Sequence, residues 1–288
     1  MKIEDKITKM EVKKLISLLR EQQPVIHCIT NNVTVNDCAN ILLAIGASPI
    51  MAQHIKEAAE VTGIAGALVC NLGATRAFGA MESSADEALK RDIPVVLDPV
   101  GVSASSYRRD FATEFLESGK VSVLRCNLSE IKSLMRGTNS GGIDVSKEDM
   151  ITPDNLKSIA ENAAFCAKKY NIIVVLTGET DIITDGENLF YVSGGSRMIK
   201  RITGGGCMSS AVLGAFLSAS ASNSKKHIAL GNHKSQKACS DISCLTRSAA
   251  ASCSFMRMMS EAAARKTRLR LGGTMTFRNE LIDACSLF

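Results

Sequence analysis

The sequence predicts an α/β fold built on a central, mostly parallel sheet with helices on both faces. Short apolar runs alternate with longer helical patterns along most of the chain, which is the pattern of strands joined by crossover helices. At least one run is continuously apolar, as expected of a strand buried on both faces. No Pro/Ser-rich linker and no shift in composition divides the 288 residues, so we expect a single domain over residues 1–288.

The first half of the chain alternates predicted helices and strands. The helices are expected at Glu11–Arg20, Asn36–Ile45, Ile55–Thr62 and Thr75–Arg91. The strands are expected at Val25–Ile29, Ser48–Met51, Ala67–Cys70 and Pro94–Leu97. The first helix carries apolar residues along one face, and Gly46 ends the second. The run at Pro94–Leu97 closes on Asp98, as expected of a buried strand.

The alternation continues through the second half and then gives way to helices. Helices are expected at Tyr107–Glu117, Ser129–Met135 and Pro153–Lys169, and strands at Val121–Arg125 and Ile172–Leu176. Ile182–Val192 is predicted as a hairpin, because Asp185-Gly186 is a turn dipeptide between two apolar stretches. From Gly206 onward the pattern is mostly helical.

Chemically unusual residues follow five of the predicted strands, at the sheet edge where such folds bind ligands. These residues are Met51 and Ala52, Asn71 and Gly73, Asp98–Gly101, Arg125 with Asn127 and Glu130, and Thr177 with Gly178. Taken alone, Asp98 fits a turn before proline, and Glu130 fits a first-turn carboxylate that interacts with a helix dipole. Together they place an arginine, an asparagine, a threonine and two carboxylates around one edge, so we expect the functional site there.

Three consecutive glycines, Gly204–Gly206, open directly into a predicted helix. Glycine permits close backbone approach and unusual dihedral angles. The free N–H groups and the dipole at a helix start favour an anion. The segment is therefore predicted to cradle a phosphate, and it lacks the lysine that defines a Walker P-loop.

Cys207 lies at the start of the same helix. There the helix dipole is expected to lower the pKa of the thiol and favour the thiolate. One interpretation is a general base beside the phosphate cradle. The other is a small apolar residue in a tight contact between loop and helix, and this interpretation ranks ahead until the surrounding motifs are considered.

Composition excludes several classes of protein. The net charge is +5, and the basic residues of the last third lack aromatic stacking partners, so we expect solvated helix faces and no nucleic-acid partner. The charged N-terminus lacks the apolar core of a signal peptide, and no run approaches a membrane span. The ten cysteines form no CxxC pair and no Cys/His metal spacing, so we expect buried free thiols in a cytoplasmic protein.

Several long motifs resemble those of the hydroxyethylthiazole kinase family. They are CITNNVTVNDCANILLAIGASPIMA (Cys28–Ala52), VVLDPVGVSAS (Val95–Ser105), LRCNLSEI (Leu124–Ile131), VVLTGETDIITDG (Val174–Gly186), ITGGGCMSSAVLGAFL (Ile202–Leu217) and GGTMTFRNELIDA (Gly272–Ala284). The motifs occur in the family's order, and the resemblance runs from about residue 12 to residue 284 with one weak zone.

The resemblance implies a ribokinase-like, three-layer α/β/α fold, usually assembled as a homotrimer with active sites between subunits. It implies transfer of the γ-phosphate of ATP to the primary alcohol of 4-methyl-5-(2-hydroxyethyl)thiazole, in thiamine biosynthesis or salvage, with Mg²⁺ as cofactor. The ligand-binding residues that it implies are Met51 and Gly204 for the thiazole alcohol, Arg125, Thr177 and Asn127 for ATP, and Glu130 and Asp98 for the metal. Cys207 would be the catalytic residue, at the place where most ribokinase-like kinases carry an aspartate base.

Three segments depart from the family pattern. Gly205 stands where the family usually has threonine, which is expected to remove a hydroxyl and loosen the turn. Gln53–Lys56 stands where acidic residues are common. The segment Asn223–Ser248 is more polar than the helical region normally found there, so its local fold stays open.

Other interpretations remain open at this point. A ribokinase-like kinase for another alcohol, such as a hydroxymethylpyrimidine, or a repair dehydratase on this fold would resemble an aspartate-bearing loop, and Cys207 argues against both. An inactive relative that binds thiazole or nucleotide without turnover stays open because of Gly205. A thiol-based redox protein would need a resolving cysteine near Cys207.

Overall fold

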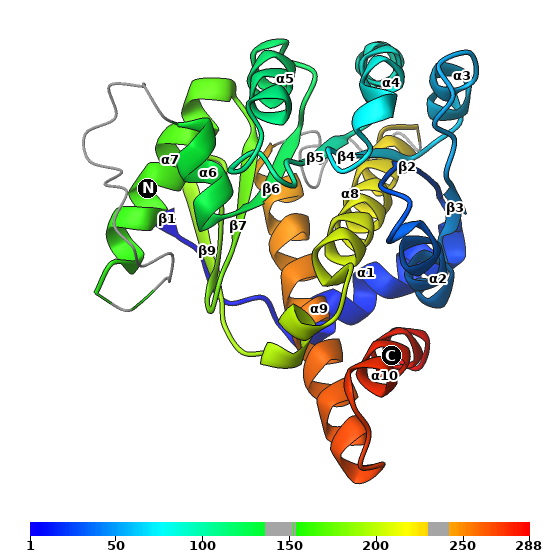
Figure 1. Cartoon of the computed structure of the whole chain (residues 1–288), viewed down its shortest axis with the longest axis vertical. Helices are drawn as coiled ribbons and strands as arrows, with labels where there is room; N and C mark the ends of the chain where they lie inside the picture. Colours follow the sequence, from blue (N-terminus) through cyan, green and yellow to red (C-terminus); the bar gives the residue numbers. More distant parts are fainter. Residues whose placement is uncertain (136–151, 153, 230–241) are drawn as a thin grey trace.

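A single mixed sheet forms the centre of the computed structural model, which describes residues 1–135, 152, 154–229 and 242–288. Its strand order in these residues is β1-β9-β8-β7-β6-β5-β4-β2-β3 (Figure 1). The strands are β1 (Lys2–Ile3), β2 (Val25–Ile29), β3 (Ser48–Ile50), β4 (Ala67–Asn71), β5 (Val95–Asp98), β6 (Val123–Asn127), β7 (Ile173–Thr177), β8 (Asp181–Thr184) and β9 (Asn188–Val192). Neighbouring strands pair in parallel except β7 with β8 and β8 with β9. The mostly parallel sheet and the Ile182–Val192 hairpin are therefore confirmed.

Helices cover both faces of the sheet and make the predicted three layers (Figure 1). One face carries α1 (Lys9–Gln22), α2 (Val35–Ile45), α8 (Gly205–Ala229), α9 (Ile242–Leu269) and α10 (Thr274–Ser286). The other face carries α3 (Ala58–Gly63), α4 (Phe78–Lys90), α5 (Ser106–Glu117), α6 (Leu128–Leu134) and α7 (Leu156–Tyr170). Two short 3₁₀ helices, η1 (Thr75–Ala77) and η2 (Arg197–Arg201), complete the described elements.

The buried strands pack against an apolar core on each face, which explains their continuous apolar runs. In β4, Ala67 and Val69 belong to one core cluster, whereas Leu68 and Cys70 belong to the other. Successive side chains of a strand point to opposite faces. Because both faces are covered, both sets of side chains must be apolar.

Some predicted boundaries shift in the structure. The helix expected from Ile55 begins at Ala58, and the segment Thr75–Arg91 is divided between η1 and α4. The strand expected at Val121–Arg125 is displaced to Val123–Asn127. Pro153 lies outside the described residues, as does part of Asn223–Ser248. The strand β1 was not predicted, because it is a pair of exposed residues at the end of the sheet, where it pairs with β9.

The cysteines differ from the expectation at one position. Eight cysteines are free thiols in the described part of the chain, and most of them are buried. Cys244, however, is disulfide-bonded, so the prediction of free thiols is wrong there. The residue lies in the first turn of α9 and is partly exposed, outside the core that buries six of the free thiols.

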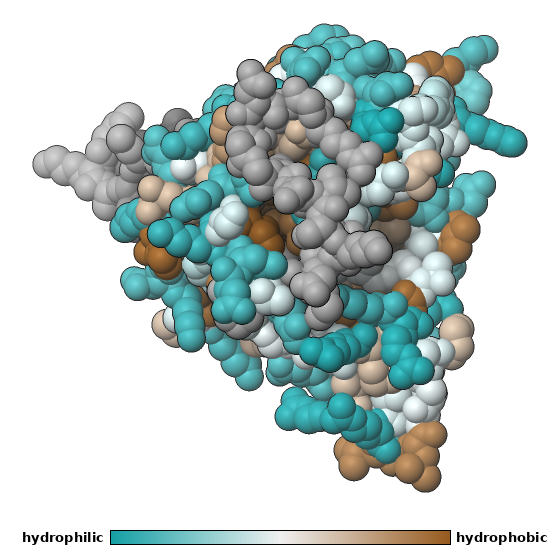
Figure 2. Space-filling model, turned by 60° about the vertical axis from the view of Figure 1, so that its left-hand side comes forward, coloured by the Kyte–Doolittle hydropathy of each residue, from teal (hydrophilic) through white to brown (hydrophobic). Residues whose placement is uncertain are grey.

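The turn between α9 and α10 stands away from the body of the molecule (Figure 1). Leu269 and Leu271 in this turn are 85% and 96% exposed. Figure 2 shows the resulting apolar surface as brown atoms at the lower tip. Among the helices of the described ranges, none combines the length and the apolar character that crossing a membrane requires.

Candidate active site

A cavity of about 1000 Å³ opens where β5, β6 and β7 end, between the start of α8 and one face of α9. The sequence-predicted residues that line it are Asp98, Arg125, Asn127, Glu130, Thr177, Gly204 and Cys207. They come together because the carboxyl ends of parallel strands meet at one edge of the sheet. Met51 is the exception, because it does not line this cavity and instead packs, partly buried, against the apolar core.

Asp98 is the fully buried carboxylate of the cavity. Its Oδ2 accepts hydrogen bonds from Ser210 Oγ at 2.7 Å and from Asn71 Nδ2 at 3.0 Å. Its Oδ1 is also buried, and within the described residues it has no hydrogen-bond partner. Burial raises the pKa of Asp98, and the positive charge of Arg125 opposes that shift. One oxygen of this carboxylate is thus held by the protein and the other is left to a ligand.

Arg125 reaches the same cavity from β6. Its Nη1 lies 3.9 Å from Asp98 Oδ2, too far for a hydrogen bond. Its Nε is buried with no hydrogen-bond partner among the described residues. A side chain on Gly206 would come within 3.0 Å of Arg125 Nη1, so the guanidinium lies directly against the glycine segment. Arg125 therefore keeps donors for an anion bound there.

The thiol of Cys207 is contacted by two side-chain amides. Asn71 Nδ2 donates to Cys207 Sγ at 3.3 Å, and Asn31 Nδ2 donates at 3.5 Å. The expected lowering of the thiol pKa is wrong, because burial and the charge of Asp98 raise the pKa of Cys207. The helix start alone does not decide the protonation state here.

Glu130 and Asn127 form a capping box at the start of α6. Glu130 Oε2 accepts from Asn127 N at 2.9 Å, while Asn127 Oδ1 accepts from Glu130 N at 3.0 Å. Burial and the charge of Asp98 raise the pKa of Glu130 to about 7. The pair Asn127 and Glu130 therefore has a local structural role, and it also brings the carboxyl group of Glu130 to the cavity wall.

The glycine segment makes close contacts that a side chain would prevent. Gly204 has a φ of +83°, and a Cβ there would lie 2.9 Å from Thr34 Cγ2. A Cβ on Gly205 would lie 2.5 Å from the carbonyl oxygen of Ile199 in η2. The turn is thus closely packed rather than loosened at Gly205, since backbone fills the space that a threonine would need.

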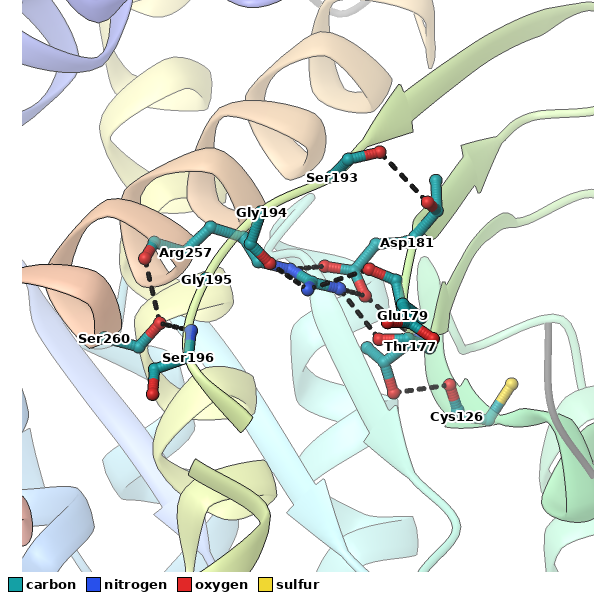
Figure 3. A network of polar contacts seen from close by, with 12 residues as sticks. Cys126, Thr177, Glu179, Asp181, Ser193, Gly194, Gly195, Ser196, Arg257 and Ser260 are labelled. Carbon is teal, nitrogen blue, oxygen red and sulfur yellow. Dashed lines mark hydrogen bonds and ion pairs between the residues drawn. The ribbon is translucent and has the colours of Figure 1, made fainter. Parts of the chain in front are cut away.

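The opposite wall of the cavity is built by two loops that lie on α9. We call residues 178–181, the turn after β7 together with the first residue of β8, the hairpin turn, and residues 193–196, after β9, the connector. Figure 3 shows Arg257 of α9 reaching both loops, with Thr177 beside them. Thr177 Oγ1 donates to the carbonyl of Cys126 at 3.2 Å, which fixes the end of β7 against β6.

Sequence reasoning missed several residues of the site. Asn31 and Ser210 were not identified, and Asn71 was placed at a strand end without a role. Arg257 and Asp181 were missed entirely, although both line the cavity. The signal for Asn71 was its position directly at the end of β4. For Arg257 the sequence offers no local signal, because its partners lie more than 60 residues away along the chain.

Residues 16–287 match the family model described as the hydroxyethylthiazole kinase family. The sequence is 47% identical over 214 residues to the hydroxyethylthiazole kinase of Clostridium beijerinckii, which covers 73% of this chain and 76% of that protein. The fold is similar to the solved structure of a hydroxyethylthiazole kinase protein from Pyrococcus horikoshii, with a TM-score of 0.74 and 28% identity over 96% of this chain and 93% of that one.

A more distant solved structure, a ribokinase-like superfamily protein from Enterococcus faecalis, has a TM-score of 0.56 and 12% identity. The match covers 94% of this chain and 94% of that one. At this identity the similarity concerns the fold alone, and it agrees with the three-layer arrangement of helices and sheet.

Proposed function

The chain belongs to the hydroxyethylthiazole kinase family, and from this premise we propose how its cavity carries out the reaction. The enzyme phosphorylates the alcohol of hydroxyethylthiazole with a nucleotide co-substrate, in thiamine biosynthesis or salvage. One observation supports placing the reaction in this cavity. Asp98, Arg125 and Cys207 all meet there at the glycine-rich start of α8.

We propose that the phosphates of ATP lie between Arg125 and the start of α8. The first N–H groups of a helix have no intrahelical partner and favour an anion, and Arg125 adds positive charge with unused donors. Asn127 and Thr177 would contact the nucleotide from the ends of β6 and β7. Gly204 would lie at the hydroxyl of the thiazole alcohol, because it lines the cavity beside Cys207.

Cys207 is proposed to receive the proton of the substrate alcohol. Phosphoryl transfer through a loose transition state depends mainly on positioning and charge neutralisation. A group that is a weak base early in the reaction therefore suffices. The raised pKa of the Cys207 thiol means that little thiolate exists at neutral pH, so the chemical step is expected to be slow.

Two of the carboxyl groups that line the cavity, those of Asp98 and Glu130, fit a magnesium ion. Mg²⁺ is usually held by one or two carboxylates together with phosphate oxygens and waters. Asp98 offers a buried, unpartnered Oδ1, and Glu130 lines the same wall. The described residues contain no group of three or more His, Cys, Asp or Glu side chains suited to a metal, so phosphate oxygens would complete the shell. We propose that these two residues hold Mg²⁺, Asp98 through a water, and that the ion offsets phosphate charge.

We further propose a homotrimer whose thiazole site lies between subunits. Met51 lies outside the cavity of its own chain, so its proposed contact with the thiazole would be made across an interface. The neighbouring surface exposes Val33 (75%) and Leu43 (60%), apolar side chains that a second subunit would cover. Light scattering at micromolar concentration tests this, and a fully active monomer would contradict it. We also propose a cytoplasmic location, because eight of the described cysteines are free thiols and one, Cys244, is disulfide-bonded.

The function is tested by measuring ADP release with three samples: the thiazole alcohol, a hydroxymethylpyrimidine alcohol, and no acceptor. We expect ADP release that depends on the thiazole alcohol. Faster release with the pyrimidine would favour the other kinase activity. Tight thiazole binding by calorimetry without ADP release would make the protein an inactive binding relative.

A further inference from the structure

We propose that Arg257 is a positioning residue for the nucleotide: from α9 it holds the hairpin turn and the connector in the arrangement that binds ATP, without contacting ATP itself. This inference rests on the proposed function, because it assumes that the nucleotide occupies the cavity. Figure 3 shows the guanidinium between the two loops, with contacts to both.

Every N–H of the Arg257 guanidinium is used within the protein. Its Nε donates to Asp181 Oδ2 at 2.9 Å, and its Nη2 donates to Asp181 Oδ1 at 2.6 Å and to the carbonyl of Gly178 at 2.9 Å. Its Nη1 donates to the carbonyls of Glu179, at 3.0 Å, and of Gly194. A guanidinium has about five N–H donors in all. None of them is left for a phosphate oxygen, although Arg257 lines the cavity.

The connector is held to α9 at three successive residues. Besides the Arg257 contact at residue 194, Gly195 N donates to Glu261 Oε1 at 2.7 Å. Ser196 N donates to Ser260 Oγ at 3.0 Å. Gly195 has a φ of +84°, and a Cβ there would lie 2.7 Å from Arg257 Cδ. The connector thus follows the helix surface closely, and Arg257 of α9 contacts both the connector and the hairpin turn.

Direct contacts between the two loops are exposed and therefore weaker. Thr180 Oγ1 and Ser193 Oγ lie 2.9 Å apart, and Arg197 Nη2 lies 2.6 Å from Glu179 Oε1. In the latter pair the side chains are 83% and 54% exposed, so solvent screens it. The Arg257 and Asp181 side chains are only 19% and 8% exposed, so this pair is a better shielded side-chain contact, and it acts beside the backbone pairing of Asp181 in β8 with Val192 in β9.

Arg125 and Arg257, which both line the cavity, therefore have different roles. Arg125 keeps unpartnered donors beside the glycine segment, so it suits the phosphates. Arg257 has its charge matched by Asp181 and its donors filled. With the phosphates near Arg125, the nucleoside part of ATP lies toward the hairpin turn and the connector. The positions of these loops then set nucleotide affinity.

The test compares Arg257→Lys with the wild type by calorimetry with ADP and by steady-state kinetics. Lysine keeps the charge but cannot reach both loops with one ammonium. We expect the Kd for ADP and the KM for ATP to rise about tenfold or more, a change of about 1.4 kcal/mol. The KM for the thiazole alcohol and kcat at saturating ATP should change by less than about threefold.

Arg247→Lys is the matched control on the same helix. Arg247 pairs with Glu11 at 2.6 Å, away from the cavity, so its substitution should leave the Kd for ADP within about twofold. Ser260→Ala is a second variant. It removes the hydroxyl that accepts a hydrogen bond from Ser196 N of the connector, and it should raise the Kd for ADP by a few-fold. It keeps the proposal testable if Arg257→Lys folds poorly.

One outcome would overturn the inference alone, namely an unchanged Kd for ADP in a folded Arg257→Lys variant. If the melting temperature of that variant is also lower, Arg257 has a purely structural role. If the wild type neither binds ADP nor consumes ATP, the proposed function itself fails, and the inference fails with it.

Discussion

Asn71 donates a hydrogen bond to the sulfur of Cys207, with Nδ2 and Sγ 3.3 Å apart. The same amide nitrogen donates to Asp98 Oδ2 at 3.0 Å. Its oxygen accepts from Gly73 N at 2.9 Å and from Asn31 Nδ2 at 3.2 Å, which fixes the orientation of the amide. Asn71 thus links the thiol to the buried carboxylate.

Asn71→Ala should lower kcat by roughly 10–100-fold, because the thiol loses a donor that orients it and favours its charged form. The same substitution in a Cys207→Ala background should have a much smaller effect, since the two residues act on one step. Asn40→Ala is a control, because Asn40 bonds within α2 to Asn36. Additive losses in the double variant would contradict the link to Cys207.

Cys207→Ala should reduce turnover by roughly 10²–10⁴-fold, the usual range for a positioned base. Substrate affinity should change little, because the proposed contacts of the alcohol are the loop backbone and Met51. Cys207→Asp should keep or raise activity. A carboxyl begins with a far lower pKa than a thiol, so it remains ionised at neutral pH even after a moderate upward shift. Unchanged turnover in the alanine variant would leave the thiol only a packing role.

Glu130→Gln should cut turnover strongly at limiting Mg²⁺ while leaving the fold intact. The glutamine oxygen still accepts from Asn127 N in the capping box, but one negative charge leaves the proposed metal site. The measurement is kcat as a function of Mg²⁺ concentration, with circular dichroism to check folding. Activity within about twofold of the wild type at limiting Mg²⁺ would remove Glu130 from the metal site.

Glu130 also predicts how stability changes with pH. Its folded-state pKa is raised from 4.5 to about 7, so the folded protein holds a proton that the unfolded chain releases. The resulting stability is fully present below pH 4.5 and is lost as the pH rises through 7. The loss amounts to about 3 kcal/mol for this group. Denaturant unfolding of the metal-free protein from pH 5 to pH 8 should therefore show a smaller decrease for Glu130→Gln. If the free energy of unfolding fell equally with pH in the wild type and in Glu130→Gln, the raised pKa of Glu130 would be contradicted.

Gly205→Ala should destabilise the protein by about 1–3 kcal/mol, because the added Cβ would press on the Ile199 carbonyl and force η2 to move. Gly79→Ala is the matched control. Gly79 lies inside the helix α4, and a Cβ there would lie 3.7 Å from Ile55 Cδ1, an ordinary van der Waals distance. Alanine favours a helix more than glycine does, so this variant should be as stable as the wild type or more stable. Thermal unfolding compares the two, and equal melting temperatures would contradict the close packing at Gly205.

The sequence predicted the sheet, its ligand-binding edge and the candidate site residues other than Met51 that line the cavity, because these depend on local patterns. Apolar runs identify buried strands, and a strand's last residues identify the ligand-binding edge. Arg257 could not be predicted, because its role depends on where α9 lies against two distant loops. The pKa of Cys207 was predicted in the wrong direction, because burial and the nearness of Asp98 appear only in three dimensions.

Among the described residues, the cysteine thiol that electrophiles and oxidants reach most easily lies in the cavity. Electrophiles and oxidants attack the thiolate form of a thiol that they can reach. Cys28, Cys70 and Cys126 are fully buried and have raised pKa values. Reagents therefore do not reach these thiols, and little of each thiol is present as thiolate. Of the two free thiols that line the cavity, Cys253 has its pKa raised to about 12, which leaves Cys207 as the more reactive one. Alkylation of the described part of the chain would therefore begin at Cys207, and a bound substrate would protect the enzyme from inactivation.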